Sequence, residues 1–279
     1  MQVILSRKGF DSSYGGMPSP ILPDGTLLAL PIPGEGEANR YTDLRYGFQS
    51  YLDIIRQLEP TTRIKEHHAC HLDPDLVEGV VERTAPWLPL FGQCNQSQRH
   101  LARHGVGAGD LFLFWGWFRQ TELYRGRFRY CPDAPDVHLI WGFMKVKQVA
   151  TGRRMPSEYA YHPHGRRSLE SNAIYEGDPA RTGVLTYHPE LVLTRQGMTR
   201  SKWGIPMFFQ RISISYHSAD SFRDGYFQSA KRGQEFILEE CKEAEEWANG
   251  LIGTSQAAGC RGRRRCRCAC SGSVSPAPR

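Results

Sequence analysis

GDLFLFWGWF, residues 109–118, is the most strand-like stretch of the chain. Gly109 and Asp110 supply a turn, and the eight residues that follow are apolar or aromatic apart from Gly116. A run this short and this aromatic, bounded by a turn, is typical of a buried β-strand. We therefore expect a buried strand over 111–118.

Three further apolar runs predict strands around this one. VHLIWGFMKVKQV (137–149) ends in an alternation of apolar and polar residues, and GVLTYHPELVLT (183–194) is the third long run. The run Val3 to Leu5 at the N-terminus is a short buried strand that leads directly into a polar loop. Long strands with an Arg-rich connection between them predict a mixed or antiparallel sheet that curls.

Helices are expected on either side of these strands. In 43–58, apolar residues from Leu44 to Leu58 recur at steps of four, four, three and three, which places them on one helical face. Helices are also predicted over 93–104, ended by Gly105, and over 236–252. The fold class is therefore α+β, with one domain over 1–253 and a low-complexity tail over 254–279 that we expect to be disordered.

The charge of the chain lies in that tail. The net charge is +6, and residues 254–279 hold six Arg and no acidic residue, so the remainder has a net charge of zero. A neutral body argues against a broadly basic nucleic-acid binder. No apolar run reaches the roughly 18 to 20 residues of a membrane helix, and the N-terminus lacks the order of a secretory signal. We expect a soluble, cytoplasmic protein with no membrane partner, whose oligomeric state the sequence leaves open.

HHACHLDPDL, residues 67–76, is the richest cluster of groups that bind metals or move protons. His71 and Asp73 are two residues apart, so in an extended chain they point to one side and could hold one ion. His162 and His164, with the same spacing, could complete a two-His, one-carboxylate set, which suits Fe(II) and would also suit Zn²⁺. Two other readings stay open: a polar catalytic loop without metal, and a helix cap in which Asp73 or Asp75 precedes a helix near Leu76.

Two other stretches contain groups that bind anions or bases. SRKGFDSSYGG (6–16) places Arg7 and Lys8 beside glycines and hydroxyls, which suits a phosphate or carboxylate, although the spacing is not that of a P-loop. MTRSKWGIP (198–206) places Arg200 and Ser201 before Trp203, which suits a phosphate with a stacked base. Either stretch could also be a solvated surface segment.

Several of these stretches together resemble a known family. In this order the chain contains SRKGFDSSYGGMPSPILPDGTLLALPIP, HLDPDL, FGQ, GDLFLFWGWF, HLIWGFMKV, HPH and RSKWGIPMFF. From about residue 2 to about 218, it resembles the nucleotide modification associated domain of the third type, a bacterial and phage family proposed to take part in modifying nucleic-acid bases. The resemblance implies that its polar positions form one site: Arg7, Lys8, Asp11, Ser12, His71, Asp73, Asp75, His162, His164, Arg200 and Ser201.

The leading hypothesis is a metal-assisted enzyme that modifies a nucleotide or nucleobase. The metal, Fe(II) in preference to Zn²⁺, would be held by His71, Asp73, His162 and His164. With iron the reaction would be an oxygen-dependent hydroxylation, and with zinc a hydrolysis or deamination through bound hydroxide. Catalytic candidates are Lys8, Asp11 and Asp75. Substrate-binding candidates are Arg7, Ser12, Arg200, Ser201, Trp117 and Trp203. The partner would be a nucleotide or another small anion, with nucleic acid as a further option.

Two rival hypotheses use the same residues differently. A non-catalytic module with a small β-barrel would bind a modified base in a cage of Trp115, Trp117 or Trp141 and would need no metal. A metal-dependent enzyme of small-molecule metabolism would act on a small anionic metabolite, which the neutral body favours slightly.

Overall fold

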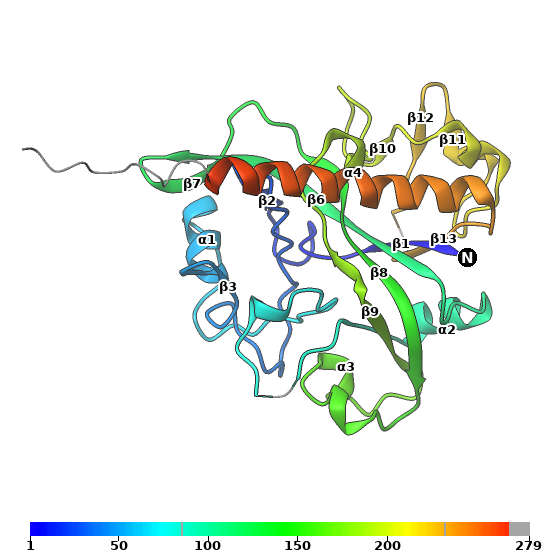
Figure 1. The fold of residues 1–279 in the computed structure, drawn as a ribbon, viewed down its shortest axis with the longest axis horizontal. Coiled ribbons are helices and arrows are strands. Elements are labelled where there is room, and N and C mark those ends of the chain that lie inside the picture. Colours follow the sequence, from blue (N-terminus) through cyan, green and yellow to red (C-terminus); the bar gives the residue numbers. More distant parts are fainter. Residues whose placement is uncertain (85, 232, 268–279) are drawn as a thin grey trace, which may run out of the picture.

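A mixed, curled sheet of eight strands organises the computed structural model, which describes residues 1–84, 86–231 and 233–267 (Figure 1). The strand order is β13-β1-β6-β8-β9-β5, and β2 and β7 both pair with β6. The pairs β1–β6 and β2–β6 are parallel, and the other pairs are antiparallel. The strands are β1 (Val3–Arg7), β2 (Ser19–Ile21), β5 (Leu90–Cys94), β6 (Leu111–Tyr124), β7 (Arg127–Tyr130), β8 (Val137–Thr151), β9 (Asn172–Val184) and β13 (Glu235–Ile237).

Smaller elements surround this sheet. The hairpin β3 (Arg45–Tyr46) and β4 (Gln49–Ser50) precedes helix α1 (Tyr51–Leu58), and β10 (Lys202–Trp203), β12 (Tyr226–Gln228) and β11 (Phe222–Arg223) form a separate sheet. The remaining helices are α2 (Asn95–Arg103), α3 (Pro163–Arg166) and α4 (Lys242–Arg267). None of the described helices is long and apolar enough to span a bilayer.

The predicted fold class is confirmed, because helices flank a mixed sheet that curls into a half-barrel. The strands expected over 111–118 and 137–149 are both present and both longer than expected. Their aromatic residues fill the interior: Phe112 and Phe114 stack at 6.0 Å between ring centroids, and Phe91 and Tyr175 pack against them. Such aromatic packing and its buried apolar area hold the sheet in its curl.

The expected strand over 183–194 is wrong in its position. β9 ends at Val184 and starts at Asn172, and the residues after it contain a short 3-10 helix, Pro189–Leu191. Proline has no N–H to donate to a sheet, so Pro189 favours a turn. The real strand contains Gly177, Asp178 and Pro179, residues that usually signal a loop, and its pairing with β8 shifts register there.

The helix expected over 43–58 begins later than predicted. Gly47, with a φ of +57°, turns the chain between β3 and β4, and Phe48 is fully exposed instead of lying on a buried helical face. Ser50 caps α1 because its side chain accepts a hydrogen bond from the Asp53 N–H. The Asp53 carboxylate in turn accepts a bond from the Ser50 N–H. A strong capping box therefore fixes the start of the helix, against the apolar periodicity.

The other helix bounds shift by a few residues, and one expected cap is absent. Gln93 belongs to β5 and Phe236 to β13, so α2 and α4 each start after a strand. Asp75 makes an isolated bridge to Leu90, and no helix begins at Leu76. Of the tail over which disorder was expected, residues 254–267 lie within α4, and residues 268–279 are outside the described part of the chain. The single domain over 1–253 stays a prediction.

Candidate metal centre

His71 and Asp73 flank a tight turn at Leu72, in which the Asp73 N–H donates to the His71 carbonyl at 2.9 Å. Cys70 and Leu72, which alternate with them, are buried in a second hydrophobic core that also contains α1. The backbone N–H of His71 donates to Ile32 O at 2.8 Å, which fixes the segment against the 31–39 loop. Because Cys70 and Leu72 are buried in that core, the side chains of His71 and Asp73 are left to face the cavity.

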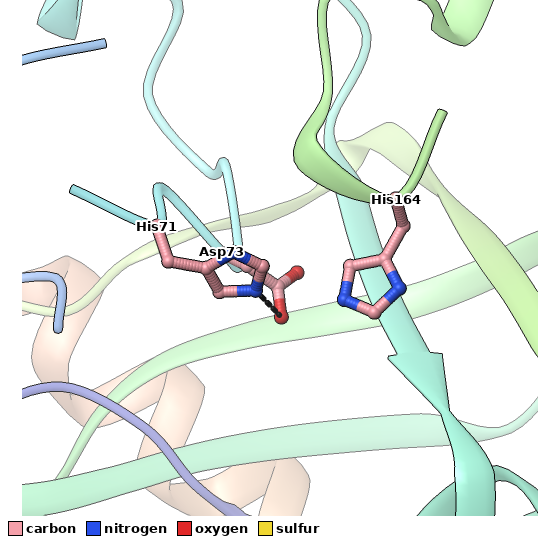
Figure 2. Close-up of side chains that lie close together, drawn as sticks. All are labelled: His71, Asp73 and His164. Atoms are coloured by element: carbon pink, nitrogen blue, oxygen red, sulfur yellow. Dashed lines mark ion pairs between the residues drawn. The ribbon is translucent and has the colours of Figure 1, made fainter. Parts of the chain in front are cut away.

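His164 reaches the same point from α3, across strand β5 (Figure 2). Its ring lies directly over Gly92, where an added Cβ would come within 2.2 Å of the His164 Cγ. The Gly92 N–H donates to Asp73 Oδ1 at 2.7 Å. Gly92 therefore makes room for one side chain of the site and orients another.

One ligand atom from each of His71, Asp73 and His164 lies within 4.8 Å of the others. His71 Nε2 lies 3.8 Å from Asp73 Oδ2. Figure 2 shows the two rings and the carboxylate converging from two segments of the chain, one with His71 and Asp73 and the other with His164. Two imidazoles and one carboxylate in this arrangement are a ligand set for non-heme Fe(II) or for Zn²⁺.

Each histidine of the cluster is held by a partner at its other nitrogen. His71 Nδ1 donates to Glu37 Oε1 at 2.7 Å, and His164 Nδ1 lies 2.8 Å from Asn172 Oδ1. The Asn172 side chain also donates to the His164 carbonyl at 2.8 Å. With Nδ1 engaged, the Nε2 atoms keep their lone pairs for a ligand, as in most protein metal sites.

The protonation of the cluster favours a cation. Burial alone would raise the pKa of Asp73, but the Lys8 ammonium and a contact with His162 outweigh it and hold that pKa well below its usual range. Burial lowers the pKa of His164 to about 4, so its ring is neutral near pH 7. A charged carboxylate beside a neutral imidazole is the form that binds a metal.

Lys8 lies between two buried carboxylates. Its Nζ is 3.5 Å from Asp73 Oδ2 and 3.9 Å from Glu235 Oε1, and its side chain is only 10% exposed. Gln93 donates to the same Glu235 oxygen. Gln93 belongs to β5 and Glu235 to β13, the two outer strands of the sheet, so this group links the open edges of the half-barrel beside the metal cluster.

A cavity of about 460 Å³ opens over the cluster, a volume in the range of small-molecule sites. His71, Asp73 and His164 lie in its wall. Its charged lining residues are Arg7, Lys8, Arg167, Asp11 and Asp73. Asp11 Oδ1 accepts bonds from the N–H groups of Ser13 and Tyr14, so this carboxylate also shapes the loop at the mouth of the cavity.

The structure places His162 behind the cluster. Its ring is fully buried, with Nε2 at 3.3 Å from Asp73 Oδ1, the oxygen that also accepts the Gly92 N–H. Its Nδ1 accepts from the His164 N–H at 3.3 Å. His162 therefore contacts the carboxylate ligand and is not one of the three converging groups.

Asp75 and Trp203 do not reach the cavity. Asp75 is 2% exposed, forms an ion pair with Arg83 and accepts from Trp87 Nε1 at 3.2 Å. Trp203 is 1% exposed, donates to His138 Nδ1 at 3.1 Å, and has no face free for a base. Both side chains therefore stabilise the fold around them and do not contribute to the cavity.

Five of the six predicted substrate-binding residues, all except Arg7, lie outside the cavity lining. Arg200 places its guanidinium 3.9 Å from the Trp117 ring centroid and donates to Ser12 Oγ. Ser201 follows Arg200, and its carbonyl accepts the Ser229 N–H at 3.0 Å. This group adjoins the Asp11 loop through Ser12. Of the eleven residues that the resemblance placed in one site, the structure brings Arg7, Lys8, Asp11, His71, Asp73 and His164 to one cavity.

Sequence reasoning missed the residues that support the ligands. Glu37 lies in a Gly- and Glu-containing loop, GEGE, that resembles any solvated turn. Asn172 starts β9, the strand that was not predicted, and Arg167 follows the HPH motif as one of two arginines. Only the motif FGQ gave a signal, since it contains Gly92 and Gln93.

The comparison with known proteins supports the resemblance drawn from these motifs. The family profile of nucleotide modification associated domain 3 matches residues 2–239, which include every residue of the metal cluster and its partners. No curated protein and no solved structure matches the chain. Because the match covers most of the sequence, the chain belongs to the nucleotide modification associated domain 3 family.

Proposed function

We propose that this protein is a metal-assisted enzyme that modifies a nucleotide or a nucleobase. The observation that carries the proposal is the convergence of His71, Asp73 and His164 within 4.8 Å at the wall of a cavity. Membership of a nucleotide modification family supports the substrate class.

The residues present fit a divalent metal. His71, Asp73 and His164 would hold the ion at the wall of the cavity, and the Nδ1 partners Glu37 and Asn172 fix both rings. Bound there, Fe(II) would support oxygen chemistry, whereas Zn²⁺ would supply an activated water. We favour Fe(II), because two imidazoles with one carboxylate are its usual set in oxygenases.

The chain's own residues have separate tasks in this proposal. Asp73 is the charged ligand, and Lys8 holds its Oδ2 atom while Gly92 holds Oδ1. Lys8 is the candidate to stabilise negative charge that develops on the substrate, since its ammonium borders the cavity. Asp11, at the mouth, is the remaining carboxylate in the lining and the candidate to accept a proton.

A binding module without chemistry fits the structure less well. Its cage would need exposed aromatic faces, but Trp115 is 0% exposed and Trp141 is 4% exposed, both within the main core. An enzyme acting on a small anionic metabolite would use the same cavity. Incubation with nucleosides, nucleotides and short DNA distinguishes it from a nucleotide enzyme.

Elemental analysis of the intact chain, purified without an affinity metal column, tests the proposal. We expect about one iron, zinc or manganese per chain, lost in His71→Ala and kept in His67→Ala, whose ring is exposed in the same stretch. Metal-loaded protein is then incubated with nucleosides, nucleotides and short DNA, and product masses are followed. A wild-type protein that takes up no metal, even after anaerobic reconstitution with Fe(II), would rule out the mechanism.

A further inference from the structure

We infer that Arg7 and Arg167 form the binding site for a phosphate group of the substrate, beside the metal cluster. The inference rests on the proposed function and specifies its substrate: a phosphate ester, either of a free nucleotide or of a nucleic-acid strand. Arg167 was in none of the candidate sets drawn from the sequence.

The three cations of the cavity differ in how far their charge is already used. Lys8 has carboxylate oxygens at 3.5 Å and 3.9 Å and is 10% exposed, so two carboxylates of the protein already share its charge before a substrate binds. Arg7 is partly exposed, and among the residues that the structure describes its side chain pairs with no carboxylate. Its nearest aromatic contact is the Trp115 ring, 6.0 Å from Cζ. Of the three cations, Arg7 is therefore the one whose charge is least balanced by carboxylates of the protein.

Arg167 is anchored at one end and open at the other. One of its terminal nitrogens bonds Glu37 Oε1, the atom that also accepts from His71 Nδ1. The side chain is 40% exposed and lines the cavity. A guanidinium has five N–H donors in a fixed plane, so the donors not used by Glu37 can bind an oxyanion in a bidentate manner.

The charge of the whole lining also favours an anion. Three cations and two carboxylates line the cavity, which gives 3 − 2 = +1 for the lining before any metal is bound; Glu37 and Glu235 pair with two of these cations from outside the lining, and Arg7 has no such partner among the described residues. A divalent ion would bring this sum to +3. Asp11 opposes an anion, but it lies on the loop at the mouth, where two backbone N–H groups already bond its Oδ1.

Calorimetric titration of the full, metal-free chain tests the inference apart from any metal chemistry. The probes are inorganic phosphate, a deoxynucleoside 5′-monophosphate and the matching nucleoside. We expect the monophosphate to bind at least tenfold more tightly than the nucleoside. Arg7→Gln and Arg167→Gln should each weaken it by about tenfold or more, the effect of one lost charged hydrogen bond.

Arg153→Gln is the matched control, because Arg153 is 66% exposed, pairs with Glu170 and does not line the cavity. It should bind the monophosphate as the wild type does. Arg167→Lys should recover part of the affinity, since it keeps the charge and loses the planar fork. Circular dichroism of each variant identifies any loss of folding.

Short DNA strands with and without a 5′-phosphate distinguish the two sources. Binding that requires the terminal phosphate indicates a free nucleotide or strand end; equal binding of both, lost in the arginine variants, indicates an internal phosphodiester. Equal affinity for nucleoside and monophosphate, or unchanged affinity in both arginine variants, would overturn the inference. If the wild type binds metal but no phosphate-bearing probe, the phosphate site is overturned and the metal enzyme is not. If it binds phosphate but takes up no metal, the phosphate site is supported and the metal enzyme is overturned.

Discussion

The two histidine segments of this chain, 67–71 and 162–164, look alike in sequence, but their histidines occupy different positions in the structure. In the first, His71 enters the metal cluster, whereas His67 is exposed and His68 Nδ1 accepts a backbone bond from Lys65. In the second, His164 enters and His162 lies behind Asp73.

A side-chain acceptor at Nδ1 distinguishes the two rings that enter the cluster from His68 and His162. His71 has the carboxylate of Glu37, and His164 has the amide oxygen of Asn172. His162 Nδ1 accepts a backbone N–H instead. A side-chain acceptor at Nδ1 fixes the tautomer and turns Nε2 toward the site, so the supporting residue, and not the spacing, selects the ligand.

The largest effect is expected from the two aspartates of the first segment. Asp73→Asn removes the charged ligand and should weaken metal binding by more than about 100-fold, beyond the range for supporting residues. Asp75→Asn should leave metal affinity within a few-fold, yet cost about 3 kcal/mol of stability, because Arg83 then lacks its buried partner. Metal titration and urea denaturation of both variants measure this contrast. Equal loss of metal affinity in the two would show that Asp75 belongs to the site.

Gly92→Ala should disturb the second segment alone. Its new Cβ would lie 2.2 Å from His164 Cγ, so the ring must move away from the cluster. We expect a loss of about 1–3 kcal/mol in stability from overpacking, together with weaker metal binding. Gly250→Ala is the control, since a Cβ there meets nothing within 4 Å, and alanine suits the interior of α4 better than glycine. A Gly92→Ala protein with normal metal affinity would contradict the placement of His164.

Glu37→Gln tests the supporting residue of the first segment. The amide keeps the size of the side chain but removes the negative charge that His71 and Arg167 share. Metal affinity should fall by about 10- to 100-fold. Glu170→Gln changes the charge equally at a side chain that is 80% exposed, and it should have no effect on metal affinity. If both variants bind metal as the wild type does, a partner at Nδ1 does not select the ligand.

A smaller effect is expected from pH. Burial lowers the pKa of His164 to about 4 and that of His138, a half-buried residue outside the cavity, to about 3, from a reference of 6.5. Below pH 6.5 these two rings take up protons in the unfolded chain but stay neutral in the folded protein, because their folded pKa values are lower. The stability of the metal-free protein should therefore fall as pH drops, by up to about 1.4 kcal/mol per pH unit for each ring.

Urea denaturation at pH 7 and pH 5.5 measures this slope, and His138→Gln should reduce it by about the share of one ring. Added metal should steepen the slope through His164 and not through His138, because protons and metal compete only at the ligand. The same slope with and without metal would mean that His164 does not bind it.

The sequence predicted the framework of this fold better than its edges. Aromatic runs at 111–118 and 137–149 marked the two central strands, since burial of such side chains leaves few alternatives. β9 was missed because its pairing tolerates a Gly-Asp-Pro segment that local preference assigns to a turn. The start of α1 was predicted too early because the capping box of Ser50 and Asp53, and not the spacing of apolar residues, determines where the helix begins.

The site was predictable in part for a similar reason. The H-x-D motif placed His71 and Asp73 on one side, and the HPH motif supplied His164. The choice between His162 and His164 depends on Asn172 and Gly92, which come from other strands. Arg167 and Glu37 join the site only through tertiary contacts, so no local pattern could identify them.

Metal stoichiometry of His164→Ala and His162→Ala, measured side by side, tests the central claim most directly. If His71, Asp73 and His164 hold the ion, His164→Ala should lose it after dialysis. His162→Ala should keep about one ion per chain, with a lower unfolding midpoint because a buried contact to Asp73 is gone. Loss of the metal in His162→Ala with full retention in His164→Ala would contradict the account.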